Sequence, residues 1–347
     1  MPTDIARPPP STAAVWPTGP VPTGEQTPAS VDDLVLASHL AQTGGLDGLY
    51  RAVRAGRFLR LARGVFVAET IWRGMSADER YLATVRACAR SVPHRELLFS
   101  HHSAAALWRL PVLGAWPRLP EVVREPAPGG RSRRALTVHP DGVPDDTVLI
   151  DGLRATTLAR TAVDIARTAP FARAVAMTDR ALAIGTVESS DFSATLRAEA
   201  EAHPSPKGSA RARRVLAFAD PRSDSAGESL SRVTMSLLGF APPELQREFR
   251  DRAGSMFADF WWPSAHGGEA GIVGEFDGVG KYLRSDMLGA HSTADALMAE
   301  KRREDRIRAL GPRVVRWGWD TARSLSELER VLAAAGVPRA PHARGVR

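Results

Sequence analysis

The stretch GIVGEFDGVGKY, residues 271–282, runs from apolar residues into two carboxylates and then into glycines and a lysine. The alternation of Glu275, Phe276 and Asp277 predicts a strand, because side chains two positions apart on a strand project from the same face. The two carboxylates therefore project together where an apolar strand ends. This stretch decides how the C-terminal part of the chain folds and which chemistry it can carry.

A second strand is predicted just upstream, in MFADFWWP (residues 256–263), where Asp259 interrupts an apolar and aromatic run. If the two strands pair as a hairpin through the turn between them, Asp259 stands beside Glu275. Up to three carboxylates, Asp277 included, then surround one point.

Carboxylates grouped at a sheet edge repel one another unless a hard cation neutralises them, and ligation by oxygen alone favours Mg2+ or Mn2+. Such an ion binds a scissile phosphate and lowers the pKa of a bound water. Glu228 lies in the first turn of a helix that starts within SDSAGESL (residues 223–230), and Lys281, one short turn beyond Asp277, adds positive charge for the transition state. The pattern predicts phosphodiester hydrolysis.

The segment EKRREDRIRALG (residues 300–311) predicts a later helix, and RVVRWGW (residues 313–319) predicts the strand that follows it. We expect Arg302 to lie nearest to a bound phosphate. The other charges of this helix pair at i, i+3 and i, i+4 spacing, which stabilises a solvated helix without any catalytic role. Trp317 and Trp319 are expected to pack in the interior rather than to stack on bases.

Asp259, the run EFDG with Lys281 and Tyr282, and EKRREDRIRALGPRVVRWGW resemble, in this order, the domain of unknown function 559 group, relatives of the very short patch repair endonucleases in the PD-(D/E)xK nuclease superfamily. The resemblance covers about residues 224–325 and implies a mixed sheet flanked by helices. It implies these site residues: Asp259 and Glu275 as metal ligands, the Phe276 carbonyl as a further ligand, and Glu228 as the carboxylate of the first helix. Where the superfamily motif has lysine this chain has Asp277, and Lys281 is expected to take that role.

The N-terminal part predicts a DNA-binding module. VDDLVLASHLAQTGG (residues 31–45) and LDGLYRAVRAG (residues 46–56) have helical apolar spacing, and FLRLARGVFVA (residues 58–68) predicts a small hairpin around Arg63-Gly64. Two short helices and a hairpin make a winged helix-turn-helix, whose second helix enters the major groove. Arginines recur every third residue and are candidate phosphate contacts: Arg51, Arg54, Arg57, Arg60 and Arg63. The alternative is a small helical domain with a solvated arginine face.

The N-terminal pattern is similar to the winged-helix domain of AbiEi-type antitoxins of type IV toxin–antitoxin systems. That resemblance implies a cognate toxin as a partner.

The remaining chain predicts an α/β multidomain protein. The expected parts are a disordered tail (1–30), the winged helix (31–75), a mixed α/β middle module (76–200), a linker (201–223), the nuclease-like domain (224–335) and a basic tail (336–347). In the middle module the adjacent His101 and His102 point about 100° apart on a helix, so we do not expect them to bind one zinc ion together.

Composition is that of an ordinary globular protein, with 44% hydrophobic residues and a net charge of +7 that permits nucleic acid as a partner. No long apolar run or signal-peptide pattern is present, so we expect a cytoplasmic protein without membrane contact. The single Cys88 excludes an internal disulfide bond and a thiolate zinc cluster.

Two functions remain open from the sequence. The first is a DNA-binding endodeoxyribonuclease that depends on Mg2+ or Mn2+. The second is a non-catalytic transcriptional regulator or antitoxin that keeps a degenerate nuclease fold. Asp277 at the lysine position favours the second function. The joint presence of Asp259, Glu275, Lys281 and Glu228 favours the first, because unused buried carboxylates are costly.

Overall fold

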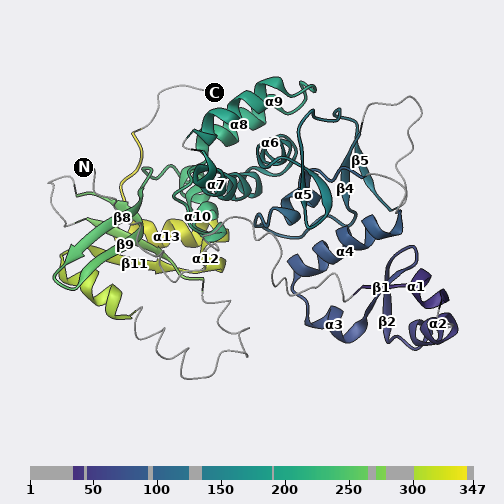
Figure 1. Ribbon diagram of the computed structural model, residues 1–347. Helices are drawn as coiled ribbons and strands as arrows, with labels where there is room; N and C mark the ends of the chain where they lie inside the picture. The colour runs from purple at the N-terminus through teal and green to yellow at the C-terminus, as the bar shows by residue number, and fades with distance from the viewer. Residues whose placement is uncertain are drawn as a thin grey trace, which may run out of the picture. The chain divides into compact units, whose positions relative to one another are not determined.

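The computed structural model describes residues 34–42, 45–92, 97–124, 135–189, 191–264, 271–278 and 301–341 of the 347-residue chain. The described residues belong to two compact units that divide after Phe218 (Figure 1). Both units combine helices with sheets, which confirms the α/β multidomain class predicted from the sequence. Among the described residues, no helix is both long and apolar enough to cross a membrane. The predicted tail at residues 1–30 lies outside the described residues.

The first unit opens with a three-stranded sheet and two short helices. Its elements are β1 (Leu34–Leu36), α1 (Ala37–Gln42), α2 (Leu46–Arg54), β2 (Phe58–Ala62) and β3 (Val65–Ala68), with strand order β1-β3-β2. The hairpin predicted around Arg63-Gly64 is present, and Gly64 takes a left-handed φ of +72° in its turn. The first helix begins later than expected, because Leu34 pairs with Val67 in a strand and is buried there.

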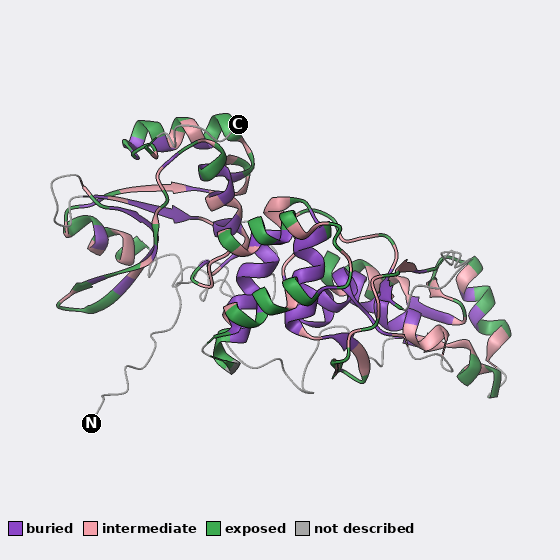
Figure 2. Ribbon diagram, turned by 90° about the horizontal axis from the view of Figure 1, so that it is seen from above, coloured by how far each residue is buried: buried purple, intermediate pink, exposed green. Residues whose placement is uncertain are grey.

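Helices dominate the rest of the first unit. The elements are α3 (Glu69–Gly74), α4 (Ala77–Ser91), α5 (His101–Leu107), β4 (Glu121–Val123), β5 (Thr137–His139), β6 (Thr147–Ile150), β7 (Leu153–Thr156), α6 (Leu158–Thr168), α7 (Phe171–Glu188), α8 (Phe192–Ala202) and α9 (Ser209–Phe218). Every residue of α6 from Leu158 to Arg167 is buried (Figure 2), because α6 contacts α5, α7, α8 and α9. Single bridges from Phe99 to Val122 and Ala155 join the β4–β5 pair to the β6–β7 pair.

The second unit is built on a four-stranded mixed sheet. Its elements are α10 (Ala226–Leu237), β8 (Glu244–Asp251), β9 (Gly254–Trp262), β10 (Ile272–Phe276), a helical segment at residues 301–309, β11 (Arg313–Trp317), α12 (Trp319–Arg323) and α13 (Leu325–Ala335). The strand order is β11-β10-β9-β8, in which β10 runs antiparallel to β9 and parallel to β11. The sequence predicted β9, β10 and β11 but not β8.

Two separate cores cover the two faces of this sheet. On one face α10, α12 and α13 pack onto Phe260, Trp262, Phe276 and Trp317. On the other face Ile307 of the 301–309 helix packs with an apolar group from the strands, namely Phe249, Met256, Ala258, Trp261 and Val273. The sheet is therefore a middle layer between helices.

Trp317 and Trp319, which follow the 301–309 helix in the sequence, pack against aromatic side chains of the sheet. The Trp317 ring stacks on Phe260 with centroids 5.4 Å apart, and its indole N–H donates to Ser231 Oγ at 2.9 Å. Trp319 meets the Phe276 ring edge to face at 5.1 Å. The prediction that both tryptophans pack in the interior agrees with these contacts.

The chain stays attached to the second unit beyond the boundary predicted at residue 335. The Ala241 N–H donates to the Pro338 carbonyl and the Ala340 N–H donates to the Gly239 carbonyl, both at 2.9 Å. Residues 338–340 therefore belong to the fold, and residues 342–347 lie outside the described residues. The predicted linker at 201–223 contains α9, which packs in the first unit.

Gly227 of α10 faces the ring of Phe276 in β10. A Cβ there would lie 2.0 Å from the Phe276 ring, so we expect Gly227→Ala to lower the free energy of unfolding of the second unit by about 1–3 kcal/mol through overpacking. Gly48 in α2 is the matched control, because nothing lies within 4 Å of its Cβ position. Gly48→Ala should stabilise the first unit by about 0.5–1 kcal/mol. Urea unfolding monitored by circular dichroism and tryptophan fluorescence measures the free energy of unfolding of both variants. Equal changes in this free energy for Gly227→Ala and Gly48→Ala would contradict the prediction.

Candidate functional site

The predicted acidic edge lies where β9 and β10 run side by side. The ladder pairs Ile272 with Trp262 and Gly274 with Phe260, and the next step of this register sets Glu275 opposite Asp259. The Phe276 N–H donates to Asp259 Oδ2 at 2.8 Å, and both acidic side chains are buried. The antiparallel pairing that the sequence predicted is therefore present.

Glu228 reaches the same region from the first turn of α10. Its carboxylate accepts hydrogen bonds from the Asp224 N–H at 2.9 Å, the Ser225 hydroxyl at 2.7 Å and the Gln246 side-chain amide at 3.2 Å. Burial raises the pKa of Glu228 well above its ordinary value of 4.5, and the neighbouring charges of Asp259 and Asp224 raise it further. Glu228 is thus fixed in place and accepts a proton more readily than an ordinary glutamate does.

The strand β8 contains one residue with a left-handed backbone, Gln246. The ladder pairs Leu245 with Phe260 and Arg247 with Ala258, and Gln246 lies between them with a left-handed φ of +52°. A left-handed backbone at a residue other than glycine is strained and persists only where its surroundings hold it. Here that conformation accompanies the hydrogen bond from the Gln246 amide to Glu228.

An arginine that the sequence analysis did not select neutralises Glu275. The Arg303 guanidinium lies 2.5 Å from Glu275 Oε2 and also donates to the Phe257 carbonyl at 2.5 Å. Arg302, which we expected nearest to the phosphate, is exposed. The signal that distinguishes the two is helical spacing, because Arg303 lies four residues before the buried Ile307 and therefore shares its face.

Two predicted site residues remain, Asp277 and Lys281. Asp277 is partly exposed, and its backbone N–H donates to the Trp317 carbonyl at 2.8 Å. Lys281 lies outside the described residues.

The convergence of three carboxylates that we expected is not found. Among the described residues, no three of the four candidate acids bring ligand oxygens within 4.8 Å of one another: Glu228, Asp259, Glu275 and Asp277. The physical reason is that Glu275 is held by Arg303, whereas Glu228 is held by three donors at the start of α10.

The five candidate DNA-contacting arginines are all exposed. They occupy the end of α2, the following turn, β2 and the β2–β3 turn: Arg51, Arg54, Arg57, Arg60 and Arg63. None of them forms an ion pair with a carboxylate of the described residues, and Arg51 and Arg60 donate only to nearby backbone carbonyls at 3.3 Å. Their charges are therefore available to an anionic partner.

No family model matches the chain. Two proteins of Mycobacterium tuberculosis, uncharacterized protein Rv2248 of strain H37Rv and uncharacterized protein MT2308 of strain CDC 1551, are each 38% identical to it over 115 residues. The match covers 33% of this chain and 41% of either relative, so the chain spans less than half the length of the relatives it matches.

The raised pKa of Glu228 predicts how stability depends on pH. Because the folded protein binds this proton more tightly than the unfolded chain, the contribution of Glu228 is fully favourable below about pH 4.5 and is lost as pH rises through the higher folded pKa. We expect the Glu228→Gln variant, which cannot ionise there, to become more stable relative to wild type as pH rises.

Urea unfolding at several pH values between 4 and 8 measures this difference. Glu327→Gln is the matched control, since Glu327 is also in the first turn of a serine-capped helix of this unit but is exposed. A difference between Glu228→Gln and wild type that stays constant across this pH range would contradict the assignment.

Proposed function

We propose that the protein binds DNA through residues 34–75 and hydrolyses phosphodiester bonds at the acidic edge of its second unit. The observation that carries the proposal is the register of β9 and β10, which sets Asp259 opposite Glu275, with the Phe276 N–H bound to Asp259. The mixed sheet between helical layers supports placing this unit in the PD-(D/E)xK class.

The donor set at this edge suits a hard divalent cation. Asp259 and Glu275 would hold Mg2+ or Mn2+, with Glu228 as a neighbouring carboxylate, and the ion would supply charge stabilisation and an activated water. Burial is the main cause of the raised pKa of Glu228, and the repulsion from Asp259 that adds to it is what a bound cation would relieve. Binding therefore favours release of the Glu228 proton.

Arg303 provides the positive charge next to Glu275 that the nuclease motif ordinarily draws from lysine. Asp277 occupies the lysine position, and the Arg303 guanidinium instead approaches Glu275 from the helical layer. An arginine fork can donate two hydrogen bonds to a phosphate. In this proposal Arg303 orients the scissile phosphate, and Lys281 remains a second candidate cation.

The order of elements in the N-terminal part supports a winged helix. β1 precedes α1 and α2, the β2–β3 hairpin follows, and β1 lies beside β3. In this arrangement α2 is the helix that enters the major groove, and the hairpin lies along the phosphate backbone. The exposed arginines Arg51, Arg54 and Arg60 lie on these two elements.

A non-catalytic regulator is the second candidate, with a cognate toxin as its partner. The observation that favours it is the 2.5 Å ion pair between Arg303 and Glu275, because a cation that ligates Glu275 must displace this guanidinium. In that case the second unit serves as a scaffold and only the winged helix acts on DNA.

Cleavage of supercoiled plasmid by the full-length protein tests hydrolysis. We expect nicking that requires Mg2+ or Mn2+, and we expect Asp259→Asn and Glu275→Gln to reduce its rate on the order of 100-fold or more. Glu248→Gln is the matched control, because Glu248 is an exposed carboxylate on the neighbouring strand β8. Cleavage without metal, or undiminished cleavage by both site variants, would exclude this site.

Arg303→Ala separates the two candidate functions. If Arg303 orients the phosphate, Arg303→Ala lowers cleavage while it strengthens Mn2+ binding, since Glu275 is released. If the unit is a scaffold, neither wild type nor Arg303→Ala cleaves DNA under any metal condition. Manganese electron paramagnetic resonance measured beside the cleavage assay reports both quantities.

The DNA-binding role predicts a change in salt dependence. We expect Arg51→Ala with Arg54→Ala to weaken duplex binding and to reduce the slope of log K against log salt by about 0.9 for each phosphate that the double variant no longer neutralises. Arg330→Ala, which removes an exposed arginine of α13, is the control and should leave the slope unchanged. Fluorescence anisotropy between low and moderate salt measures the slope; an identical slope in the double variant would reject α2 as the DNA-binding helix.

A further inference from the structure

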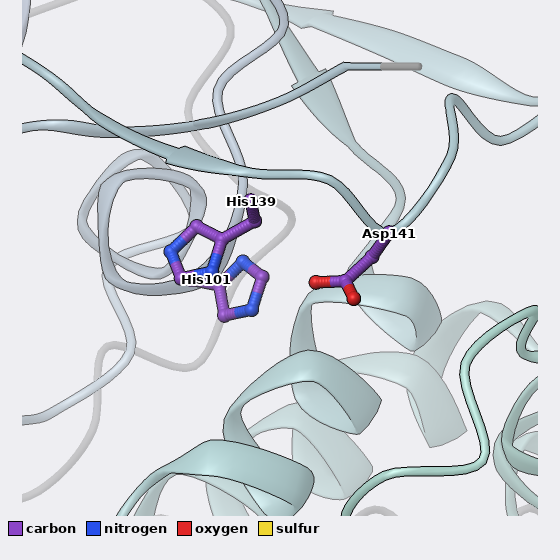
Figure 3. A group of neighbouring side chains, drawn as sticks. All are labelled: His101, His139 and Asp141. Atoms are coloured by element: carbon purple, nitrogen blue, oxygen red, sulfur yellow. The ribbon is translucent and has the colours of Figure 1, made fainter. Parts of the chain in front are cut away.

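Three side chains of the first unit bring metal-ligating atoms together outside the acidic edge. His101 begins α5, His139 ends β5 and Asp141 follows β5 by two residues, and one ligand atom from each lies within 4.8 Å of the others (Figure 3). His101 is buried, whereas His139 and Asp141 are partly exposed, so the group is reachable from solvent on one side. Two imidazoles and one carboxylate are a ligand set that binds zinc-class ions and leaves further coordination positions open.

A buried carboxylate orients the His139 ring. Glu121 of β4 accepts a hydrogen bond from His139 Nε2 at 3.3 Å, and its other oxygen accepts from the His102 N–H and ring. When His139 donates its Nε2 proton to this carboxylate, its Nδ1 lone pair is left for a ligand.

The ring of His101 is likewise oriented by polar neighbours, Ser100 and Asp164. Its Nδ1 lies 3.0 Å from Ser100 Oγ and 3.8 Å from Asp164 Oδ2. Asp164 is buried, and its Oδ2 accepts no hydrogen bond from the described residues, whereas Oδ1 accepts from Arg160 at 2.9 Å and from His203 at 3.1 Å. A proton on Nδ1 faces these acceptors, and Nε2 of His101 keeps its lone pair.

The two rings must separate slightly before they can share an ion. They are stacked with centroids 3.6 Å apart and planes within 13° of parallel, and the in-plane lone pairs of parallel rings do not meet at one point. His139 is the ring with room to tilt, because its side chain is 19% exposed and that of His101 is 1% exposed. Binding should therefore unstack the rings by movement of His139.

We propose that His101, His139 and Asp141 bind one divalent transition-metal ion of the zinc class, with Glu121 and Asp164 orienting the two histidines. This site is independent of the proposed nuclease edge, which lies in the other unit and offers only oxygen ligands. It differs from the adjacent pair His101 and His102 considered in the sequence, since His102 is bound to Glu121 through both its backbone and its ring.

Zinc titration of the full-length protein by isothermal calorimetry tests the proposal. We expect His139→Gln and Asp141→Asn each to weaken binding at one site on the order of 100-fold, because each removes a ligand. His39→Gln, which removes an exposed histidine of α1, and Asp259→Asn, which alters the acidic edge, should leave this site unchanged. Because the two substituted residues are partly exposed, we expect both variants to keep the fold, and circular dichroism checks this.

Nuclear magnetic resonance of the histidine rings supplies a second readout. Zinc should shift the ring protons of His101 and His139 together, as the rings unstack, and leave those of His39 unmoved. A wild-type protein that binds no zinc at this site would overturn the proposal. So would unaltered zinc affinity in both His139→Gln and Asp141→Asn, whatever the outcome of the cleavage assays.

Discussion

The hydrogen bond from the Phe276 N–H to Asp259 Oδ2 is the contact on which the second unit depends. It spans β9 and β10 at the point where their ladder ends, so it fixes the register of the two strands and places a carboxylate at the sheet edge. A shift of this register by one residue would turn the aromatic side chains of β9 away from their cores. The buried carboxylate of Asp259 therefore sets both the packing of the sheet and the position of the acidic side chains at its edge.

Each unit neutralises its buried acids in a different way. In the second unit Glu275 is paired with Arg303, and the pKa of Glu228 is raised by burial and, further, by the charge of Asp259. In the first unit Asp164 is bound by Arg160 and His203. A buried acidic side chain is costly unless it is paired with a cation, hydrogen-bonded or protonated. The buried acids of this chain are stabilised in these ways.

The sequence predicted the elements that carry regular apolar patterns and missed those whose pattern is ambiguous. α10, β9 and β10 follow from capping residues and strand alternation, and the adjacency of Asp259 and Glu275 follows from pairing the two predicted strands as a hairpin. Leu34–Leu36 fits helix and strand equally, and β8 buries few side chains because its alternation reverses at Gln246. Arg303 could have been chosen over Arg302 from its spacing to Ile307. The approach of His139 and Asp141 to His101 depends on how strands and helices pack at long range, which no local pattern encodes.

The left-handed residue Gln246 has a consequence for how the second unit unfolds. Leu245 and Phe249 lie on either side of this left-handed residue; Leu245 enters the core beneath α10 and α13, whereas Phe249 enters the core beneath the 301–309 helix. β8 therefore contributes to both apolar clusters, as β9 and β10 do, and neither helical layer can detach without disturbing strands that the other layer also covers. We therefore expect the two cores to melt in a single cooperative transition, although they lie on opposite faces of the sheet.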